Sequence, residues 1–239
     1  MTILFDLHTH TAASGHAFST LKENIEAARD RGLTALGTSD HPYTLPAGAP
    51  HTLFRNYGIV RSEIFGIRIL KGLEADILNT SGKLDIPDRL YPNLDYVIAS
   101  MHTVCHTPGT TEENTMALIN AMKNPHVKII GHPDDERYAY DYERLVLASK
   151  EYHTALEINN SSLRPTASRQ GAKKTLPILL SFCKRYQVPV VLGSDAHIWY
   201  DVGDLSHAQA LLNSLDFPEH LVLNSRTNGL DAILQKSII

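Results

Sequence analysis

The sequence lacks the features that would place it in several large classes of protein. It has two cysteines among 239 residues, Cys105 and Cys183, so we expect no disulfide framework, and a reducing compartment fits best. No apolar run approaches the roughly 18 residues that a membrane span needs. The opening residues, Met-Thr-Ile-Leu-Phe-Asp, lack the basic stretch of a signal peptide. We therefore expect a cytoplasmic protein with no membrane partner.

A strong charge of either sign is also missing. The formal net charge is −4, whereas nucleic-acid-binding surfaces usually show an excess of lysine and arginine. Hydrophobic residues at 43% and charged residues at 20% are typical of a globular protein. This composition disfavours nucleic acid as a partner and leaves a homo-oligomer open.

What the sequence does contain is a series of short apolar runs separated by helix-like segments. Several runs are nearly continuous, which is typical of strands buried on both faces of a parallel sheet. Strands are predicted at Ile3–Leu7, Ala35–Thr38, Arg68–Leu73, Tyr96–Ser100, Lys128–Gly131, Ala155–Ile158 and Pro189–Gly193. Helices are predicted at 20–31, 110–124, 142–152, 173–186 and from 229 onward. This alternation predicts repeated βαβ units in one domain over residues 1–239.

Nine candidate metal ligands stand near the downstream ends of these runs. Parallel α/β barrels place their working residues at the carboxyl ends of strands, so this recurrence predicts one shared cleft. A tetrahedral zinc takes four ligands, so nine indicate about two or three ions. Metal-assisted hydrolysis is the chemistry that such a centre supports. The nine are His8, His10, His16, His41, Glu74, His102, His132, Asp195 and His197.

The spacing of these residues favours common sites. His8 and His10 are two residues apart at a strand end, so their side chains face the same way, and Asp195 and His197 repeat the pattern. Glu74 follows a buried apolar run, where an unpaired carboxylate is costly. We therefore expect Glu74 to meet a cation, and its two oxygens could bridge two metals.

Other polar residues near the strand ends have less certain roles. Asp40 fits either a hydrogen bond to a ligand imidazole or a turn or cap position. Asp76 could be a hydrogen-bond partner of a ligand or a loop acid, and the loop acid is the favoured interpretation. Arg164 has the bidentate geometry that suits phosphate, and we expect it to bind substrate, with a surface salt bridge as the alternative. The segment Pro42–Pro50 is predicted to be a long loop that could cover the site.

The ordered set resembles the PHP (polymerase and histidinol phosphatase) family over the whole chain. The motifs are His8-x-His10, His16, Asp40-His41, Glu74, His102, His132 and Asp195-x-His197. The set is most similar to the small stand-alone PHP phosphatases with a trinuclear site. This resemblance implies an α/β fold, a single distorted TIM-like (β/α)7 barrel, and phosphoester hydrolysis. It also implies three sites: His8, His10, Glu74 and Asp195; Glu74, His102 and His132; and His16, His41 and His197.

The sequence therefore predicts a metal-dependent phosphatase that hydrolyses a phosphomonoester or small phosphoester with a metal-activated water. Glu74, Asp195 and Arg164 are the expected catalytic groups, and a small phosphorylated molecule is the expected partner. Nitrogen and oxygen ligands suit about three zinc ions, with manganese or iron as alternatives. One rival is an amidohydrolase-like enzyme, which often carries a metal-bridging lysine where this chain has Glu74, although Lys71 is near. The other rival is a non-catalytic metal-binding barrel.

Overall fold

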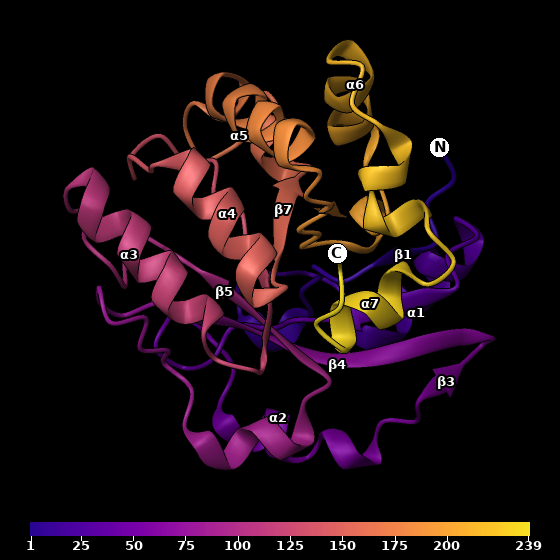
Figure 1. The fold of residues 1–239 in the computed structure, drawn as a ribbon. Coiled ribbons are helices and arrows are strands. Elements are labelled where there is room, and N and C mark those ends of the chain that lie inside the picture. Colours follow the sequence, from indigo (N-terminus) through magenta and orange to yellow (C-terminus); the bar gives the residue numbers. More distant parts are fainter.

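A computed structural model describes all 239 residues and has an α/β fold built on one sheet (Figure 1). Seven strands pair in parallel in the order β1-β2-β4-β5-β6-β7-β8. Their bounds are β1 Phe5–Asp6, β2 Ala35–Thr38, β4 Ile67–Asp76, β5 Tyr96–Ser100, β6 Val127–Ile130, β7 Ala155–Asn159 and β8 Val190–Gly193. The predicted strands are confirmed with small shifts at their ends, and the single-domain assignment stays a prediction.

The first and last strands come together and nearly close the sheet into a barrel. Thr9 and Ala196, just beyond β1 and β8, form a parallel bridge. Below this bridge, the side-chain amide of Asn224 joins the two strands. Its Nδ2 donates to the carbonyls of Phe5 and Leu192, each at 2.9 Å, and its Oδ1 accepts from the Leu192 N–H at 2.7 Å. The expected distorted TIM-like barrel is thereby confirmed.

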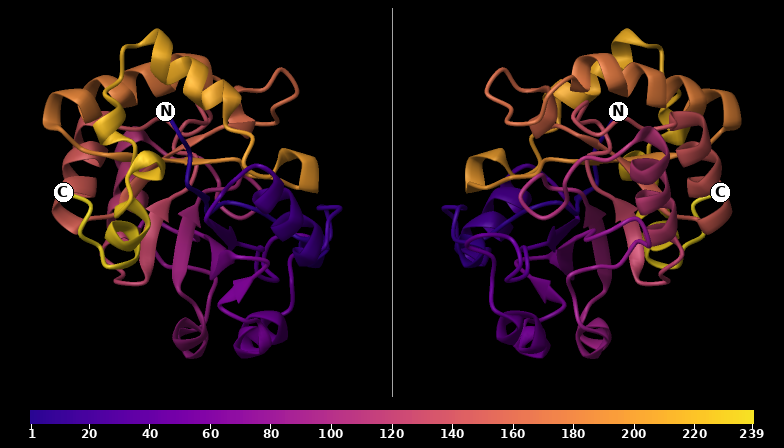
Figure 2. Two further views of the ribbon diagram at one scale, coloured as in Figure 1. Left: turned by 90° about the vertical axis from the view of Figure 1, so that its right-hand side faces the viewer. Right: turned by 90° about the vertical axis from the view of Figure 1, so that its left-hand side faces the viewer.

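Helices cover the outside of the barrel, and α3, α4 and α5 lie side by side on one flank (Figures 1 and 2). The helices are α1 Leu21–Asp30, α2 His51–Arg55, α3 Thr111–Met122, α4 Tyr142–Tyr152, α5 Ala172–Tyr186, α6 Ser206–Ser214 and α7 Gly229–Leu234. Capping boxes open α1 and α3, where Thr20 pairs with Glu23 and Thr110 with Glu113. None of the helices combines the length and the apolar character that a bilayer crossing requires.

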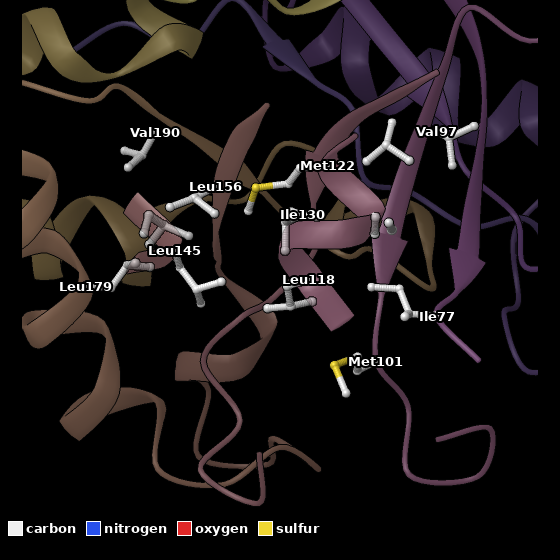
Figure 3. Close-up of a cluster of buried hydrophobic side chains, with 14 of the residues drawn as sticks. Ile77, Val97, Met101, Leu118, Met122, Ile130, Leu145, Leu156, Leu179 and Val190 are labelled. Carbon is white, nitrogen blue, oxygen red and sulfur yellow. The ribbon is translucent and has the colours of Figure 1, made fainter. Parts of the chain in front are cut away.

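The larger part of the core fills the space between the strands and these outer helices (Figure 3). Ile130 of β6 and Leu156 of β7 pack there with Leu118, Leu145 and Leu179 from α3, α4 and α5. All five side chains are fully or almost fully buried. Burial of such side chains stabilises the fold by roughly 1.5–3 kcal/mol each, which holds the strand ends in fixed positions.

A second apolar cluster fills the barrel interior, where α7 covers the amino end of the strands. Tyr96 reaches across this interior and donates its hydroxyl to the Leu7 carbonyl at 2.5 Å. Two glycines make room for its ring. A Cβ at Gly37 would lie 2.1 Å from the Tyr96 hydroxyl, and one at Gly72 would lie 2.2 Å from its Cζ.

Some elements were not expected from the sequence. Strand β3, Glu63–Ile64, pairs antiparallel with β4. The turn between them has Phe65 at φ 55° and Gly66 at φ 79°, both left-handed, as in a two-residue type I′ hairpin. Phenylalanine is unusual at such a position, so the turn gave no sequence signal. Helices α2 and α6 were also missed.

Candidate metal centre

Glu74 lies at the centre of the cluster of predicted ligands. It follows Leu70 and Gly72 on the inward face of β4, because strand residues two apart share a face. Its side chain is 1% exposed. Five imidazole Nε2 atoms surround its two oxygens: His8 at 3.0 Å, His10 at 3.4 Å and His41 at 3.3 Å from Oε2, and His102 at 3.6 Å and His132 at 2.9 Å from Oε1.

Asp195 provides the second carboxylate of the cluster. Its Oδ1 lies 3.3 Å from His10 Nε2 and 3.6 Å from both His8 Nε2 and His197 Nδ1. Its backbone has φ 55°, a left-handed conformation that costs a non-glycine residue about 1–3 kcal/mol and is typical of functional sites. Burial would raise the pKa of Asp195, but Arg169 and His8 hold it well below its usual value. The carboxylate is therefore ionised.

The remaining predicted ligands complete the same cleft. The His10 ring centroid lies 4.5 Å from that of His41 and 4.4 Å from that of His197, and the His16 ring lies 4.8 Å from His197. The structure thus brings all nine predicted ligands together at the carboxyl end of the barrel. Three groups of residues each have donor atoms that lie within 4.8 Å of one another. The groups are His8, His10 and Glu74; His41, Glu74 and His102; and His10, His41 and His197.

Two of the buried imidazoles, those of His10 and His41, have ring nitrogens that a metal ion could satisfy. Both ring nitrogens of His10 and the Nδ1 of His41 are buried without a hydrogen-bond partner, which is costly unless a ligand satisfies them. Burial and His197 lower the pKa of His10 to about 4, and burial lowers the pKa of His41 well below its usual value. Neutral imidazoles carry the lone pair that a metal needs, and a nitrogen and oxygen donor set suits zinc.

A second buried glutamate, Glu157 of β7, holds two of these histidines, one through its ring and one through its backbone. Its Oε1 lies 2.7 Å from His8 Nδ1, and its Oε2 accepts the His132 backbone N–H at 2.8 Å. Gly193 leaves room for it, because a Cβ there would lie 1.9 Å from Glu157 Oε1. Burial would raise the pKa of Glu157, but the neighbouring His8 lowers it. A carboxylate behind a ligand imidazole fixes its tautomer and its direction.

Asp76 acts on His102 in the same way. The prediction that Asp76 is a loop acid was wrong, since Asp76 is fully buried at the end of β4. Its Oδ1 lies 2.8 Å from His102 Nδ1, which directs His102 Nε2 toward Glu74. Glu74 and Asp76 are two residues apart on one strand, so their side chains share its inward face. The two-residue period of β4 could have indicated that Asp76 points into the barrel.

Asp40 neither contacts a ligand imidazole nor serves as a local turn or cap residue; it binds a distant loop. It accepts hydrogen bonds from the Thr11 N–H at 2.8 Å, the Thr11 hydroxyl at 2.7 Å and the Ser14 hydroxyl at 2.6 Å. These bonds fix the loop that leads to His16. Ser14 also accepts the His41 N–H at 3.2 Å, so Asp40 ties two ligand-bearing loops together.

Arg169 is a site residue that the sequence analysis missed. Its side chain is 13% exposed and forms an ion pair with Asp195. It also donates to Asn159 Oδ1 at 3.0 Å and to the Ser162 hydroxyl at 2.7 Å. The only available signal was a second arginine in the loop that contains Arg164.

Arg164 lines the same cavity as Arg169, but its guanidinium forms ion pairs with two aspartates. Its two terminal nitrogens lie 2.5 Å from Asp201 Oδ2 and 3.5 Å from Asp204 Oδ2. The salt bridge considered as the alternative is therefore present. Arg164 nonetheless lines the same cavity as the cluster, so its contact with substrate stays a prediction.

A polar cavity of about 360 Å³ opens above the cluster. Of its 14 lining residues only two are hydrophobic, and both Arg164 and Arg169 are among the polar ones. One of the two hydrophobic residues is Leu45, which belongs to the loop Pro42–Pro50. The volume suits a small ligand.

Lys71 does not take part in the cluster. It lies three residues before Glu74 on β4, so it occupies the opposite face of the strand. Its backbone N–H donates to Asp95 at 2.8 Å, and no lysine contacts Glu74. The bridging lysine of the amidohydrolase-like alternative therefore has no counterpart here.

Comparison with known proteins gives concordant matches. The PHP domain model matches residues 6–163. A Clostridium acetobutylicum protein named "Probable phosphatase" is 46% identical over 94% of this chain and 91% of its own length. One of the same name from Caldanaerobacter subterraneus subsp. tengcongensis is 45% identical over 99% and 92%. A Lactococcus lactis histidinol phosphate phosphatase, solved with zinc, L-histidinol and phosphate, has a similar fold, with a TM-score of 0.60 at 20% identity over 90% of this chain and 94% of that one.

Proposed function

This chain belongs to the PHP domain family, and on that basis we propose that it is a metal-dependent phosphatase that hydrolyses a small phosphomonoester. Two relatives at 46% and 45% identity, matched over more than nine-tenths of their lengths, carry the name phosphatase. The observation that carries the proposal is the buried carboxylate of Glu74, ringed by imidazole nitrogens beneath a small polar cavity. The cavity volume of about 360 Å³ favours a small substrate.

We assign the cluster three zinc-binding positions, with manganese or iron as alternatives. The two oxygens of Glu74 face different imidazoles, which supports a bridging role: Oε2 faces His8 and His10, and Oε1 faces His102 and His132. Asp195 Oδ1 joins the first set. His16, His41 and His197 form the third position. When bound, the metal ions would supply Lewis acidity and a water acidic enough to attack phosphorus near neutral pH.

The two arginines of the cavity wall would bind the phosphoryl oxygens. Arg169 lies beside Asp195, so its positive charge is held close to where the phosphoryl group must be. A guanidinium fixed in place by its neighbours needs little reorganisation to stabilise the charge that develops on those oxygens. We place Arg169 at the phosphate and Arg164 farther out, since Asp201 and Asp204 already engage Arg164.

The proposal is tested by phosphate release from 4-nitrophenyl phosphate and from a panel of phosphorylated metabolites by metal-loaded protein. Asp195→Asn should lower kcat/KM by about 100-fold or more, because a metal ligand and the Arg169 partner are lost together. His207→Ala, at an exposed position of α6, is the matched control and should be unchanged. Hydrolysis of cyclic amides but not phosphate esters would favour the amidohydrolase, and neither activity would favour a non-catalytic barrel.

A further inference from the structure

Exposed large apolar side chains recur in the loops that carry the site histidines. Each of four histidines is followed two residues later by such a side chain: His16 by Phe18, His41 by Tyr43, His102 by Val104, and His197 by Trp199. With Tyr200, we call these residues the apolar rim. Their exposed fractions are Phe18 79%, Tyr43 74%, Val104 67%, Trp199 50% and Tyr200 53%. Large apolar side chains exposed on neighbouring loops are a feature of binding surfaces.

The rim residues belong to the loops that border the polar cavity. None of them lines the cavity itself, and Trp199 also lines a separate shallow hollow against α1. All four histidines that precede the rim residues line that cavity. On one side, the Phe18 N–H donates to the His197 carbonyl at 2.7 Å, and the rings of Trp199 and Tyr200 lie 5.6 Å apart.

On the other side, the Cys105 thiol lies 3.9 Å from the Thr44 carbonyl, which brings the loops of Val104 and Tyr43 together. The two parts are therefore held by defined contacts between loops rather than placed independently.

The cavity and the rim suit different parts of one molecule. Only two of the 14 cavity residues are hydrophobic, so an apolar group gains little inside it. A phosphoryl group held among the imidazoles and arginines leaves the rest of an ester directed toward the mouth. An aromatic or large aliphatic group there could pack on the rim, where ring contacts are favourable.

We propose that the apolar rim is the leaving-group subsite and that the preferred substrates are phosphomonoesters of alcohols that carry an aromatic or other large apolar group. The proposal rests on the proposed phosphatase function. Hydrolysis breaks the bond between phosphorus and the ester oxygen, water supplies the new oxygen on phosphorus, and the alcohol leaves with a proton. The rim takes no part in this exchange and acts only by binding the alcohol.

The test compares propyl phosphate with 3-phenylpropyl phosphate. Both release a primary alkoxide of similar basicity, so a difference in kcat/KM reports binding of the ring and not leaving-group chemistry. We expect the phenyl ester to be preferred by about tenfold or more. The double substitution Tyr43→Ser and Trp199→Ser should remove the preference and leave propyl phosphate unchanged. Ile59→Ser, at an apolar residue that is 86% exposed and does not line the cavity, is the control.

A second readout does not depend on turnover. Trp199 is the only tryptophan, so its fluorescence reports the rim directly. Titration with 3-phenylpropylphosphonate should change the emission of metal-loaded protein, whereas propylphosphonate should not. Equal kcat/KM for the two esters would overturn the subsite while the phosphatase stands.

Three further outcomes are decisive. If neither ester is hydrolysed although 4-nitrophenyl phosphate is, the subsite is overturned and the phosphatase stands. If none of the three is hydrolysed, the phosphatase proposal fails, and the phosphonate titration still decides whether the rim binds the ring. The protein could instead self-associate in a concentration-dependent way that the double variant abolishes, with no preference for the phenyl ester. That result would assign the rim to contact between copies and overturn the subsite.

Discussion

Glu157 illustrates how one side chain can set the geometry of a cluster without joining it. Its two oxygens contact His8 Nδ1 and the His132 N–H, from residues that follow β1 and β6. Both histidines then present Nε2 to Glu74, at 3.0 and 2.9 Å. The positions of two ligands on distant strands therefore depend on one carboxylate.

Removing this carboxylate should weaken metal binding. Glu157→Leu leaves the His132 N–H without an acceptor and His8 without its Nδ1 partner, so we expect zinc affinity to fall by about 10- to 100-fold. Glu157→Gln still offers an oxygen to the N–H and should lose less. Competition with a chelating dye measures the affinity, and circular dichroism confirms that each variant is folded. Equal affinity in both variants and the parent would contradict the role given to Glu157.

Asp85 should make the metal-free protein less stable as the pH rises. Burial and the nearby Asp76 raise the pKa of Asp85 from 3.8 to about 7, so the folded state holds a proton that the unfolded state releases. The contribution of Asp85 is complete below about pH 4 and is lost as pH rises toward 7. The asparagine of Asp85→Asn does not titrate, so this variant should be more stable than the parent at pH 8, by about 1–3 kcal/mol.

Urea unfolding of both metal-free proteins between pH 4 and pH 8 measures this difference. Asparagine keeps an oxygen to accept the Asp76 N–H, which Asp85 Oδ1 binds at 2.9 Å, so the comparison isolates the charge. A stability difference that does not change with pH would exclude titration of Asp85 as its source.

At the scale of single residues, the sequence predicted the candidate metal ligands better than the residues that hold those ligands in position. Glu74 was recognised because a carboxylate after a buried strand needs a cation, and the same reasoning applies to Glu157, whose strand is equally apolar. Arg169 is different, because the loop that returns it to Asp195 has no periodicity from which its direction could be inferred.

At the scale of elements, β4 shows how a strand divides the barrel interior into layers. Its inward residues run from Leu70 through Gly72 to Glu74 and Asp76, so the strand is apolar at one end and acidic at the other. Gly72 separates the two parts and admits the Tyr96 ring. The apolar packing on the amino side of Gly72 thereby fixes the position of the two carboxylates on its carboxyl side.

Adding one methyl group at this position should destabilise the barrel. A Cβ at Gly72 would lie 2.2 Å from Tyr96 Cζ, so Gly72→Ala must displace a ring that is buried and hydrogen-bonded to Leu7. We expect a loss of about 1–3 kcal/mol in the free energy of unfolding. Gly58→Ala is the matched control, because a Cβ there meets nothing within 4 Å. Equal unfolding midpoints for the two variants in denaturant would contradict the packing described.

The elements that sequence could predict are those with a strong pattern. The seven parallel strands are continuous apolar runs, and capping boxes marked the starts of α1 and α3. Strand β3 has two residues and exists only by pairing with β4. The position of the catalytic end followed from topology, whereas the contacts of the loops there depend on side chains from distant parts of the chain.

At the scale of the whole molecule, the cluster joins the two ends of the chain. His8 and His10 follow the first strand, Asp195 and His197 follow the last, and Glu74 lies between them. Metal ions bound to all of these would link β1, β4 and β8. The bound metal should therefore stabilise the closed barrel as well as support the reaction.

Metal removal should accordingly lower the thermal stability. A ligand present at about 100 times its Kd, and bound only by the folded state, adds about 2.7 kcal/mol. Scanning calorimetry of chelator-treated protein should give a lower Tm, and added zinc should restore it. Restoration that fails in His10→Ala but succeeds in His207→Ala would place the effect at the cluster. A Tm that is the same with and without metal would mean that the cluster does not hold ions.

The most direct test of the central claim is a zinc titration in which bound metal and phosphate release are measured on the same samples. Metal-free protein receives zinc stepwise, and each sample is analysed for zinc per chain and for hydrolysis of 4-nitrophenyl phosphate. We predict no hydrolysis without metal and a rate that rises until about two to three ions are bound per chain. Full activity with fewer than two ions, or undiminished hydrolysis by metal-free protein, would contradict the multinuclear phosphatase.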